Sequence, residues 1–299
     1  MRYILIGLLL FSFTLSAQQP TLSFTIDDGN LGNSPIYTFE EWNGRLLAAL
    51  DSAGVQAAFF VRTKDMDSEK GQHLLQSWDA KGHLIANHTY SHPYFNGKDN
   101  TAQLFEYELL KADSLIKSYN NYTRLFRFPY LKEGNTPEKV DSIRQILKMH
   151  NYRNGYVTID ASDWYIDSRL RKRLKENPSA DLEPFKQFCV EHLYERALFY
   201  ESLSFAITGR HIKHTLLLHH NLAAALFLDD LIAFFKEKGW RIVSAKEAFA
   251  DPIYERIPKH AGGGLIWALA KDTGYYDEQL RYPAEDSRYE KERMDELGL

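Results

Sequence analysis

The sequence has little of several features that would define a protein class. It has one cysteine, Cys189, in 299 residues, so no disulfide can form within the chain. Its one long apolar run, from Tyr3 to about Phe13, is shorter than the roughly 20 residues a membrane-spanning helix needs. Basic residues are not in excess, since 36 Lys and Arg face 40 Asp and Glu. A net charge of −4 makes nucleic acid a poor partner.

The amino terminus has the pattern of a signal peptide. Arg2 precedes the apolar run, and the small pair Ser16-Ala17 precedes Gln18. The alternative is a membrane anchor, which the shortness of the run disfavours. We therefore predict that residues 1–17 are a signal peptide, that no stable membrane span remains after cleavage, and that the protein is exported, either periplasmic or secreted.

The rest of the chain alternates between short apolar segments rich in β-forming residues and longer segments with helical spacing. Expected strands are Thr21–Ile26, Ala57–Val61, His83–Ala86, Leu125–Phe128, Gly155–Ile159, His214–Leu218 and Arg241–Val243. Expected helices are Phe39–Ala53, Gly71–Lys81, Thr101–Tyr119, Thr136–His150, Leu182–Ile207 and Ala223–Lys238. This alternation predicts an α/β barrel of mostly parallel strands wrapped in helices.

Two segments stand outside the alternation. Residues from about 165 to 213 read as a helical insertion, and its basic run 169–175 is either a solvated helix face or a docking patch for an acidic polymer. We therefore predict a barrel over residues 18–250 that carries this insertion. Residues 251–299 are rich in Gly, Tyr and charge, and we interpret them as an arm packed on the barrel.

Polar clusters follow several of the expected strands, where α/β barrels build their active sites. Asp27 and Asp28 follow the first strand, and on an extended chain their carboxylates would point to opposite faces. His88 and His92 are four residues apart, so both imidazoles can reach one cation from a single helical turn. Two histidines and one carboxylate would leave positions open for water and substrate. The segment Asp27-Asp28-Gly29 alone also fits a turn, and a pair of histidines four residues apart is alone weak evidence for a metal site.

Later strands end in further candidates. Arg127 follows the fourth strand, and a buried arginine there needs a carboxylate partner, for which Asp27 is the natural candidate. Asp160 follows the fifth strand, and His219 and His220 end the sixth. Strand alternation places His219 on the same face as Leu217, although His219 taken alone could be structural.

Five segments, in order, resemble the five motifs of the polysaccharide deacetylases of carbohydrate esterase family 4, whose shared unit is the NodB homology domain. They are Thr25-Ile26-Asp27-Asp28-Gly29, His88-Thr89-Tyr90-Ser91-His92, Arg127-Phe128-Pro129-Tyr130, Asp160 to Trp164, and Leu217-Leu218-His219. The resemblance covers about residues 21–245 without the insertion. Ile26 replaces the usual phenylalanine, and His220 stands where an aspartate is common.

The resemblance implies a distorted (β/α) barrel and one divalent metal, usually zinc. It implies that Asp28, His88 and His92 bind the metal, that Asp27 is the general base and that His219 is the general acid. It also implies that Arg127 orients Asp27 and that Asp160 holds the His219 ring. Further implied roles are an oxyanion contact from the backbone amide of Tyr130 and a pocket for the acetyl methyl walled by Trp164 and Leu217.

The expected activity is deacetylation of a polysaccharide, with N-acetylglucosamine units of peptidoglycan or an exopolysaccharide as the leading substrate. The alternatives are an O-acetyl esterase acting on a xylan-type polymer, a small-amide hydrolase, or a non-catalytic carbohydrate-binding protein. Aromatic residues make up 14% of the chain, and some of them could stack on sugar rings, although most must lie in the core.

Overall fold

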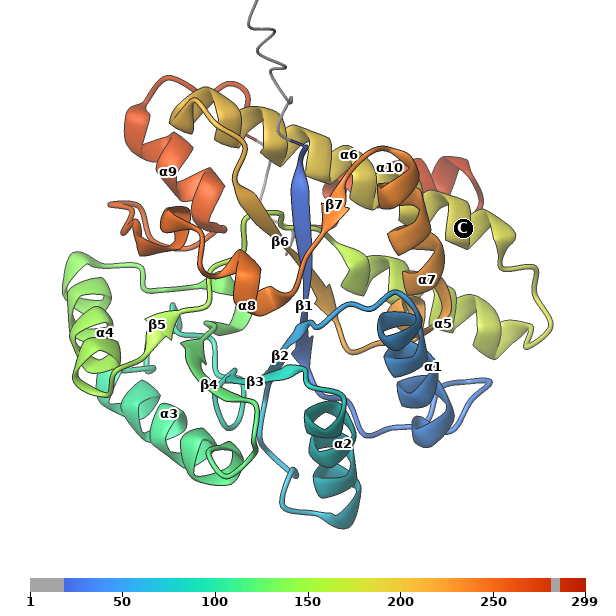
Figure 1. The fold of residues 1–299 in the computed structure, drawn as a ribbon, viewed down its shortest axis with the longest axis horizontal. Helices are drawn as coiled ribbons and strands as arrows, with labels where there is room; N and C mark the ends of the chain where they lie inside the picture. The colour runs from blue at the N-terminus through green and yellow to red at the C-terminus, as the bar shows by residue number, and fades with distance from the viewer. Residues whose placement is uncertain (1–18, 281–285) are drawn as a thin grey trace, which may run out of the picture.

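The computed structural model describes residues 19–280 and 286–299, so the predicted signal peptide, residues 1–17, lies outside the described residues. Parallel strands form one curled sheet at the centre of the molecule, with helices around it (Figure 1). The strands are β1 (Thr21–Asp28), β2 (Ala58–Val61), β3 (Leu84–Asn87), β4 (Tyr122–Phe126), β5 (Arg153–Asn154), β6 (Lys213–His219) and β7 (Arg241–Ile242). Their order is β5-β4-β3-β2-β1-β6, and β7 pairs with the start of β1. The predicted α/β barrel architecture is confirmed.

Helices connect successive strands and cover the outside of the sheet. They are α1 (Phe39–Ser52), α2 (Glu69–Ala80), α3 (Ala102–Ile116), α4 (Pro137–Met149), α5 (Asp163–Glu176), α6 (Glu183–Thr208), α7 (Leu222–Glu237), α8 (Ala245–Ala248), α9 (Leu265–Thr273) and α10 (Arg288–Glu296), with short 3-10 turns η1 (Pro129–Leu131) and η2 (Pro252–Glu255). Side chains of Thr38, Ser68, Thr101, Thr136 and Asn221 accept backbone N–H groups at helix starts. Such caps satisfy donors that have no partner within the helix. None of the helices in the described ranges is long and apolar enough to cross a membrane.

The expected strand Gly155–Ile159 is wrong. Strand β5 ends at Asn154, and the following segment crosses to β6 with a single bridge between Ile159 and Leu216. Gly155 lies against Phe60, where an added Cβ would come within 2.3 Å of the ring, so the chain passes too close for a regular strand with side chains. Thr158 holds the segment to β6, because its hydroxyl accepts the backbone N–H of Thr215 at 2.8 Å. The segment 155–159, which has no regular secondary structure, thus connects the two edge strands β5 and β6.

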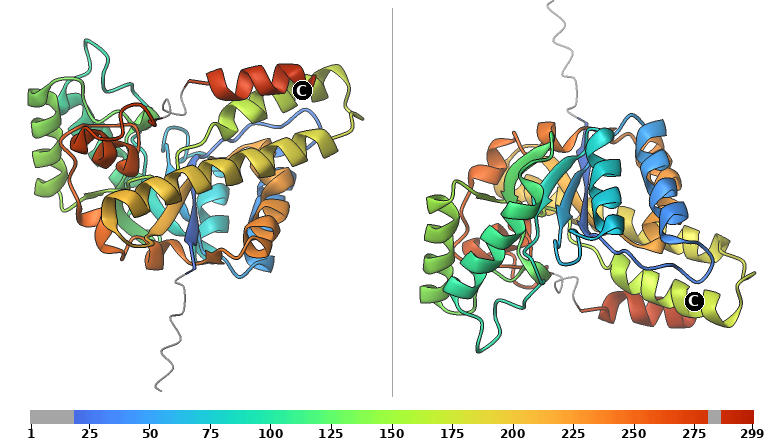
Figure 2. Two further views of the ribbon diagram at one scale, coloured as in Figure 1. Left: turned by 90° about the horizontal axis from the view of Figure 1, so that it is seen from above. Right: turned by 90° about the horizontal axis from the view of Figure 1, so that it is seen from below.

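The basic run in α5 contacts the chain's own last helix. Arg169 donates to Asp295 at 2.6 Å and to the carbonyl oxygen of Leu299, and Arg173 donates to the carbonyl oxygen of Gly298. Figure 2 shows α10, in red, lying along α5 in both views. Part of the run therefore docks a segment of this protein. The boundaries predicted at residues 165, 213 and 250 stay predictions.

A buried charge cluster fixes α10 on α6. Glu290 is fully buried, and its Oε1 lies 2.7 Å from Arg196 Nη2 and 3.0 Å from His192 Nε2. Burial would raise the pKa of Glu290, but its contacts with His192 and Arg196 lower it to about 2. The carboxylate is therefore charged in the folded protein at all but strongly acidic pH.

We predict that Glu290→Gln destabilises the protein by about 3–5 kcal/mol, because it leaves the buried Arg196 without a countercharge. Urea unfolding of this variant and of Glu292→Gln, an exposed position on the same helix, checks the prediction. The control should change the free energy of unfolding by less than about 0.5 kcal/mol.

The same cluster predicts a pH dependence. The folded pKa of Glu290, about 2, lies below the unfolded value of roughly 4.3, so its stabilisation is complete above the unfolded value and is lost as pH falls through the folded one. The stability difference between wild type and Glu290→Gln should therefore shrink from about pH 4.5 downward. A difference independent of pH would contradict this assignment.

Candidate active site

The carboxyl end of β1 brings two acidic side chains into one pocket. Asp27 is the last buried position of the strand, and Asp28 has a positive φ of 83°. This left-handed turn abolishes the alternation of an extended chain, so the expectation that the two carboxylates point to opposite faces is wrong. Both line a pocket of about 310 Å³, but they contact different partners.

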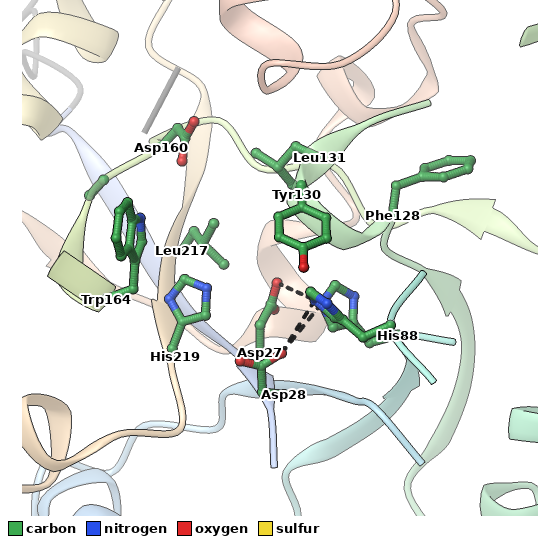
Figure 3. Close-up of a pocket in the computed structure, with 12 residues that line it drawn as sticks. Asp27, Asp28, His88, Phe128, Tyr130, Leu131, Asp160, Trp164, Leu217 and His219 are labelled. Atoms are coloured by element: carbon green, nitrogen blue, oxygen red, sulfur yellow. Dashed lines mark ion pairs between the residues drawn. The ribbon is translucent and has the colours of Figure 1, made fainter. Parts of the chain in front are cut away.

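Three candidate metal ligands converge in this pocket (Figure 3). Asp28 Oδ1 lies 3.5 Å from His92 Nε2 and 3.8 Å from His88 Nε2, and ligand atoms of all three residues lie within 4.8 Å of one another. Ligand atoms around one tetrahedral zinc, with bonds of about 2.0–2.1 Å, are about 3.3 Å apart. The three residues therefore fit a single divalent cation.

The histidine tautomer supports the same interpretation. His88 Nδ1 lies 2.8 Å from the carbonyl oxygen of Arg127, which can only accept a hydrogen bond, so Nδ1 carries the proton and Nε2 has a free lone pair toward Asp28. Metal-binding histidines are commonly oriented by such a contact. Burial lowers the pKa of His88 well below its usual value, which keeps the ring neutral as a metal ligand requires.

Arg127, which follows β4, holds Asp27 at the end of β1. Its Nη1 donates to Asp27 Oδ1 at 2.5 Å and to the Thr25 hydroxyl at 2.9 Å, and its Nε donates to the carbonyl oxygen of Gly155 at 2.9 Å. The predicted partnership of Arg127 and Asp27 is present. Burial raises the pKa of Asp27 and the charge of Arg127 opposes this, which leaves the pKa at about 6. Asp27 is then mostly ionised at neutral pH, with its Oδ2 toward His88 at 3.7 Å.

His219 ends β6 on the pocket side, across from the metal ligands (Figure 3). Its Nδ1 lies 2.7 Å from Asp163 Oδ1, and its backbone N–H donates to Asp163 Oδ2 at 2.8 Å. Burial lowers the pKa of His219, but the charge and hydrogen bond of Asp163 outweigh burial and raise it to about 10. His219 is therefore protonated at neutral pH.

The prediction that Asp160 holds the His219 ring is wrong, because Asp163 occupies that position. Asp163 begins α5, and Asn221 also donates to its Oδ2 at 2.8 Å. Asp160 lines the pocket instead. Burial lowers the pKa of Arg127, and the charge of Asp27 and, less strongly, that of Asp160 oppose this. The sequence signal was available, since Asp163 directly precedes Trp164, but spacing alone does not tell which of two aspartates three residues apart faces the ring.

His220 points away from the pocket. Its Nδ1 accepts the backbone N–H of Asn30 at 3.0 Å, its Nε2 lies 3.0 Å from Asn43 Oδ1, and its ring packs on Trp42 at 4.3 Å. Burial lowers its pKa to about 3. The alternation argument that put His219 on the pocket side is confirmed.

The remaining expected residues line the same pocket. Trp164 and Leu217 lie beside His219, and Tyr130 lies beside the metal ligands (Figure 3). Tyr130 has a φ of 57°, and its ring lies 4.7 Å from that of His92.

Comparison with known proteins places this arrangement in a family. The family model described as polysaccharide deacetylase matches residues 15–155, which contain Asp27, Asp28, His88, His92 and Arg127. This part of the chain is similar to the polysaccharide deacetylase family. The match ends before α5, so it does not include Asp163, Trp164 or His219.

Solved structures of polysaccharide deacetylases and their relatives share the fold. A family 4 carbohydrate esterase pseudoenzyme from Bacillus anthracis is 20% identical, with a TM-score of 0.52, over 77% of this chain and 65% of that chain. Peptidoglycan deacetylase PdaC from Bacillus subtilis is 18% identical, with a TM-score of 0.50, over 77% of this chain and 90% of that chain. No curated protein sequence gives a match. At these identities the likeness establishes the architecture, and the chemistry must be argued from the residues.

We predict that the purified protein binds one zinc ion and that His92→Ala weakens binding by more than about 100-fold, because it removes one of three ligands. His73→Ala, an exposed histidine on α2, is the matched control and should bind zinc like the wild type. Calorimetric titration measures the affinity, and zinc should raise the unfolding temperature of wild type and control only. Unchanged zinc affinity in His92→Ala would refute the site.

We also predict that Asp163→Asn lowers the pKa of His219 from about 10, because it removes the charge beside Nδ1. In Asp160→Asn the pKa of His219 should stay much higher than in Asp163→Asn. Titration of the imidazole by NMR in the chelator-treated protein distinguishes the two variants. A larger shift in Asp160→Asn would restore the original assignment.

Proposed function

We propose that this protein is a zinc-dependent hydrolase that removes acetyl groups from an N-acetylglucosamine-containing polymer such as peptidoglycan or an exopolysaccharide. The observation that carries the proposal is the meeting, in one pocket, of three metal-ligating side chains with an ionised carboxylate and a protonated imidazole. Hydrolysis of an amide needs a group that takes a proton and another that gives one. The predicted signal peptide is consistent with a substrate outside the cytoplasm.

A zinc ion held by Asp28, His88 and His92 would polarise the acetyl carbonyl and lower the pKa of a water molecule. The chain's own groups then move the protons. Asp27 Oδ2 takes a proton from the attacking water, and Arg127 keeps Asp27 oriented and ionised through Oδ1. His219 is held by Asp163 through Nδ1, so its Nε2–H is free to protonate the departing nitrogen or oxygen.

The pocket also offers a place for the acetyl group. Trp164 and Leu217 form an apolar wall beside His219, suited to a methyl group. Tyr130 turns into the left-handed region directly after Pro129, and its backbone amide is the proposed donor to the oxygen that becomes charged.

A binding protein without activity is the contrasting hypothesis, and the Bacillus anthracis relative is described as a pseudoenzyme. In this chain, however, Asp27 and His219 are oriented by separate charged partners, Arg127 and Asp163. Placing charged groups in a buried site costs free energy, and sugar binding alone gives no reason to retain both.

We predict that residues 18–299 release acetate from N-acetylglucosamine oligomers or peptidoglycan when zinc is present, and that Asp27→Asn lowers kcat by about 100-fold or more, because the base is lost. Asp99→Asn, an exposed loop position, is the matched control and should keep full activity. Zinc binding by Asp27→Asn, measured in parallel, shows that the variant is folded and loaded.

The choice of substrate separates the alternatives. Release from acetylated xylan but not from N-acetylglucosamine oligomers would indicate an O-acetyl esterase, and release from small amides alone would indicate a small-amide hydrolase. Stoichiometric zinc binding without hydrolysis of any of these substrates would favour the binding protein.

A further inference from the structure

Three aromatic rings lead outward from the candidate metal site. The ring of His92 lies 4.7 Å from that of Tyr130, and Tyr130 lies 5.5 Å from Tyr94, each pair in an edge-to-face arrangement. Tyr94 is 45% exposed and Tyr130 is 48% exposed. Two large rings are thus half in water at the rim of the pocket, where an exposed apolar surface commonly marks a binding site.

The loop that carries Tyr94 is rigidly held. The carbonyl oxygen of Tyr94 accepts hydrogen bonds from the backbone N–H of Gly97 at 2.8 Å and from Asn100 Nδ2 at 2.6 Å, which closes a tight turn. The next residue, Phe95, is fully buried and packs against the rings of Phe128 and Phe105. Tyr94 therefore projects from an anchored position.

Contacts with helix α4 and with the loop before it fix the same turn. Lys139 Nζ donates to the carbonyl oxygens of Phe95 at 3.0 Å and Gly97 at 2.8 Å, and Asn96 Oδ1 accepts the backbone N–H of Gly134 at 3.1 Å. These contacts join the loops that follow β3 and β4, which carry Tyr94 and Tyr130 respectively. The two rings are consequently held in place before any ligand arrives, which lowers the entropy cost of binding.

The backbone under Tyr130 adopts an unfavourable conformation. Tyr130 and Leu131 have φ values of 57° and 53°, and His92 has a φ of 63°. For a residue other than glycine, each such left-handed conformation costs on the order of 1–2 kcal/mol. Strain at consecutive residues beside a pocket is typical of functional loops, and here it aims the Tyr130 ring over the site (Figure 3).

Trp164 and Leu217 line the pocket across from Tyr130 (Figure 3). If the acetyl group packs against Trp164 and Leu217, the sugar that carries this group lies between that wall and the Tyr130–Tyr94 pair. A pyranose ring has an apolar face of C–H groups that packs on an aromatic ring, and its hydroxyl groups stay in water. The exposed rings match a neighbouring sugar of a polymer.

We infer that Tyr94 and Tyr130 form a subsite for the sugar unit adjacent to the one that loses its acetyl group. The inference rests on the proposed function and adds that the substrate is a chain of at least two hexosamine units. Tyr94 is the specificity-determining residue of this subsite, because it lies outside the metal site and the proton-transfer groups.

The test compares Tyr94→Ala with Tyr107→Ala, an exposed tyrosine on α3 whose ring lies beside Lys111. Zinc-loaded enzyme is assayed on N-acetylglucosamine and on its dimer and tetramer. Tyr94→Ala should raise KM for the tetramer by about fivefold with little change in kcat, because stacking contributes equally to ground state and transition state. The monosaccharide should be affected little, and Tyr107→Ala should match the wild type.

Binding of the same three sugars to Asp27→Asn, with and without Tyr94→Ala, is measured by calorimetry. A tetramer affinity that depends on Tyr94, with no hydrolysis in the wild type, would leave the subsite standing and overturn the proposed reaction. Hydrolysis with the same length dependence in wild type and Tyr94→Ala would overturn the subsite and leave the reaction standing. Absence of both binding and hydrolysis would overturn both.

Discussion

The buried contact between Arg127 and Asp27 connects the parts of the site. Arg127 leaves the end of β4, crosses the inside of the curled sheet over the ring of Phe60 at 3.7 Å, and reaches Asp27 at the end of β1. Both charged groups are almost fully buried, so each needs the other to offset its loss of hydration. The contact also positions the carbonyl oxygen of Arg127, which orients His88. One side chain and its own backbone thereby align the proposed base and a candidate metal ligand.

The rest of the site follows from the parallel sheet. Because all strands run the same way, the residues that follow β1, β3, β4 and β6 emerge at one end of the barrel. Asp28, His88 and His92 meet there without any one segment carrying the whole site. Residues on two sides of the pocket then differ in protonation, because Arg127 faces Asp27 and Asp163 faces His219. The environment, rather than the residue type, separates the acid from the base.

Much of this organisation could be predicted from sequence. Hydrophobic alternation located most of the strands, and the polar residues after them indicated the candidate metal ligands and Arg127. Local rules failed where geometry departed from the regular element. The left-handed turn at Asp28 brought both carboxylates to one pocket, and the close approach of Gly155 to Phe60 replaced a strand by irregular chain. Spacing alone could not decide between Asp160 and Asp163 as the partner of His219 for a similar reason, since the choice depends on where α5 begins in space.

The contact between α5 and α10 was beyond sequence reasoning, because it joins segments far apart in the chain. Arg169 and Leu299 are 130 residues apart, so their contact closes a long loop between the middle and the end of the chain. Helix α5 begins with Asp163 and Trp164, which support the proposed proton donor and line the pocket. The helix that carries them is thus braced by the last residues of the chain, a segment that contributes no side chain to the pocket itself.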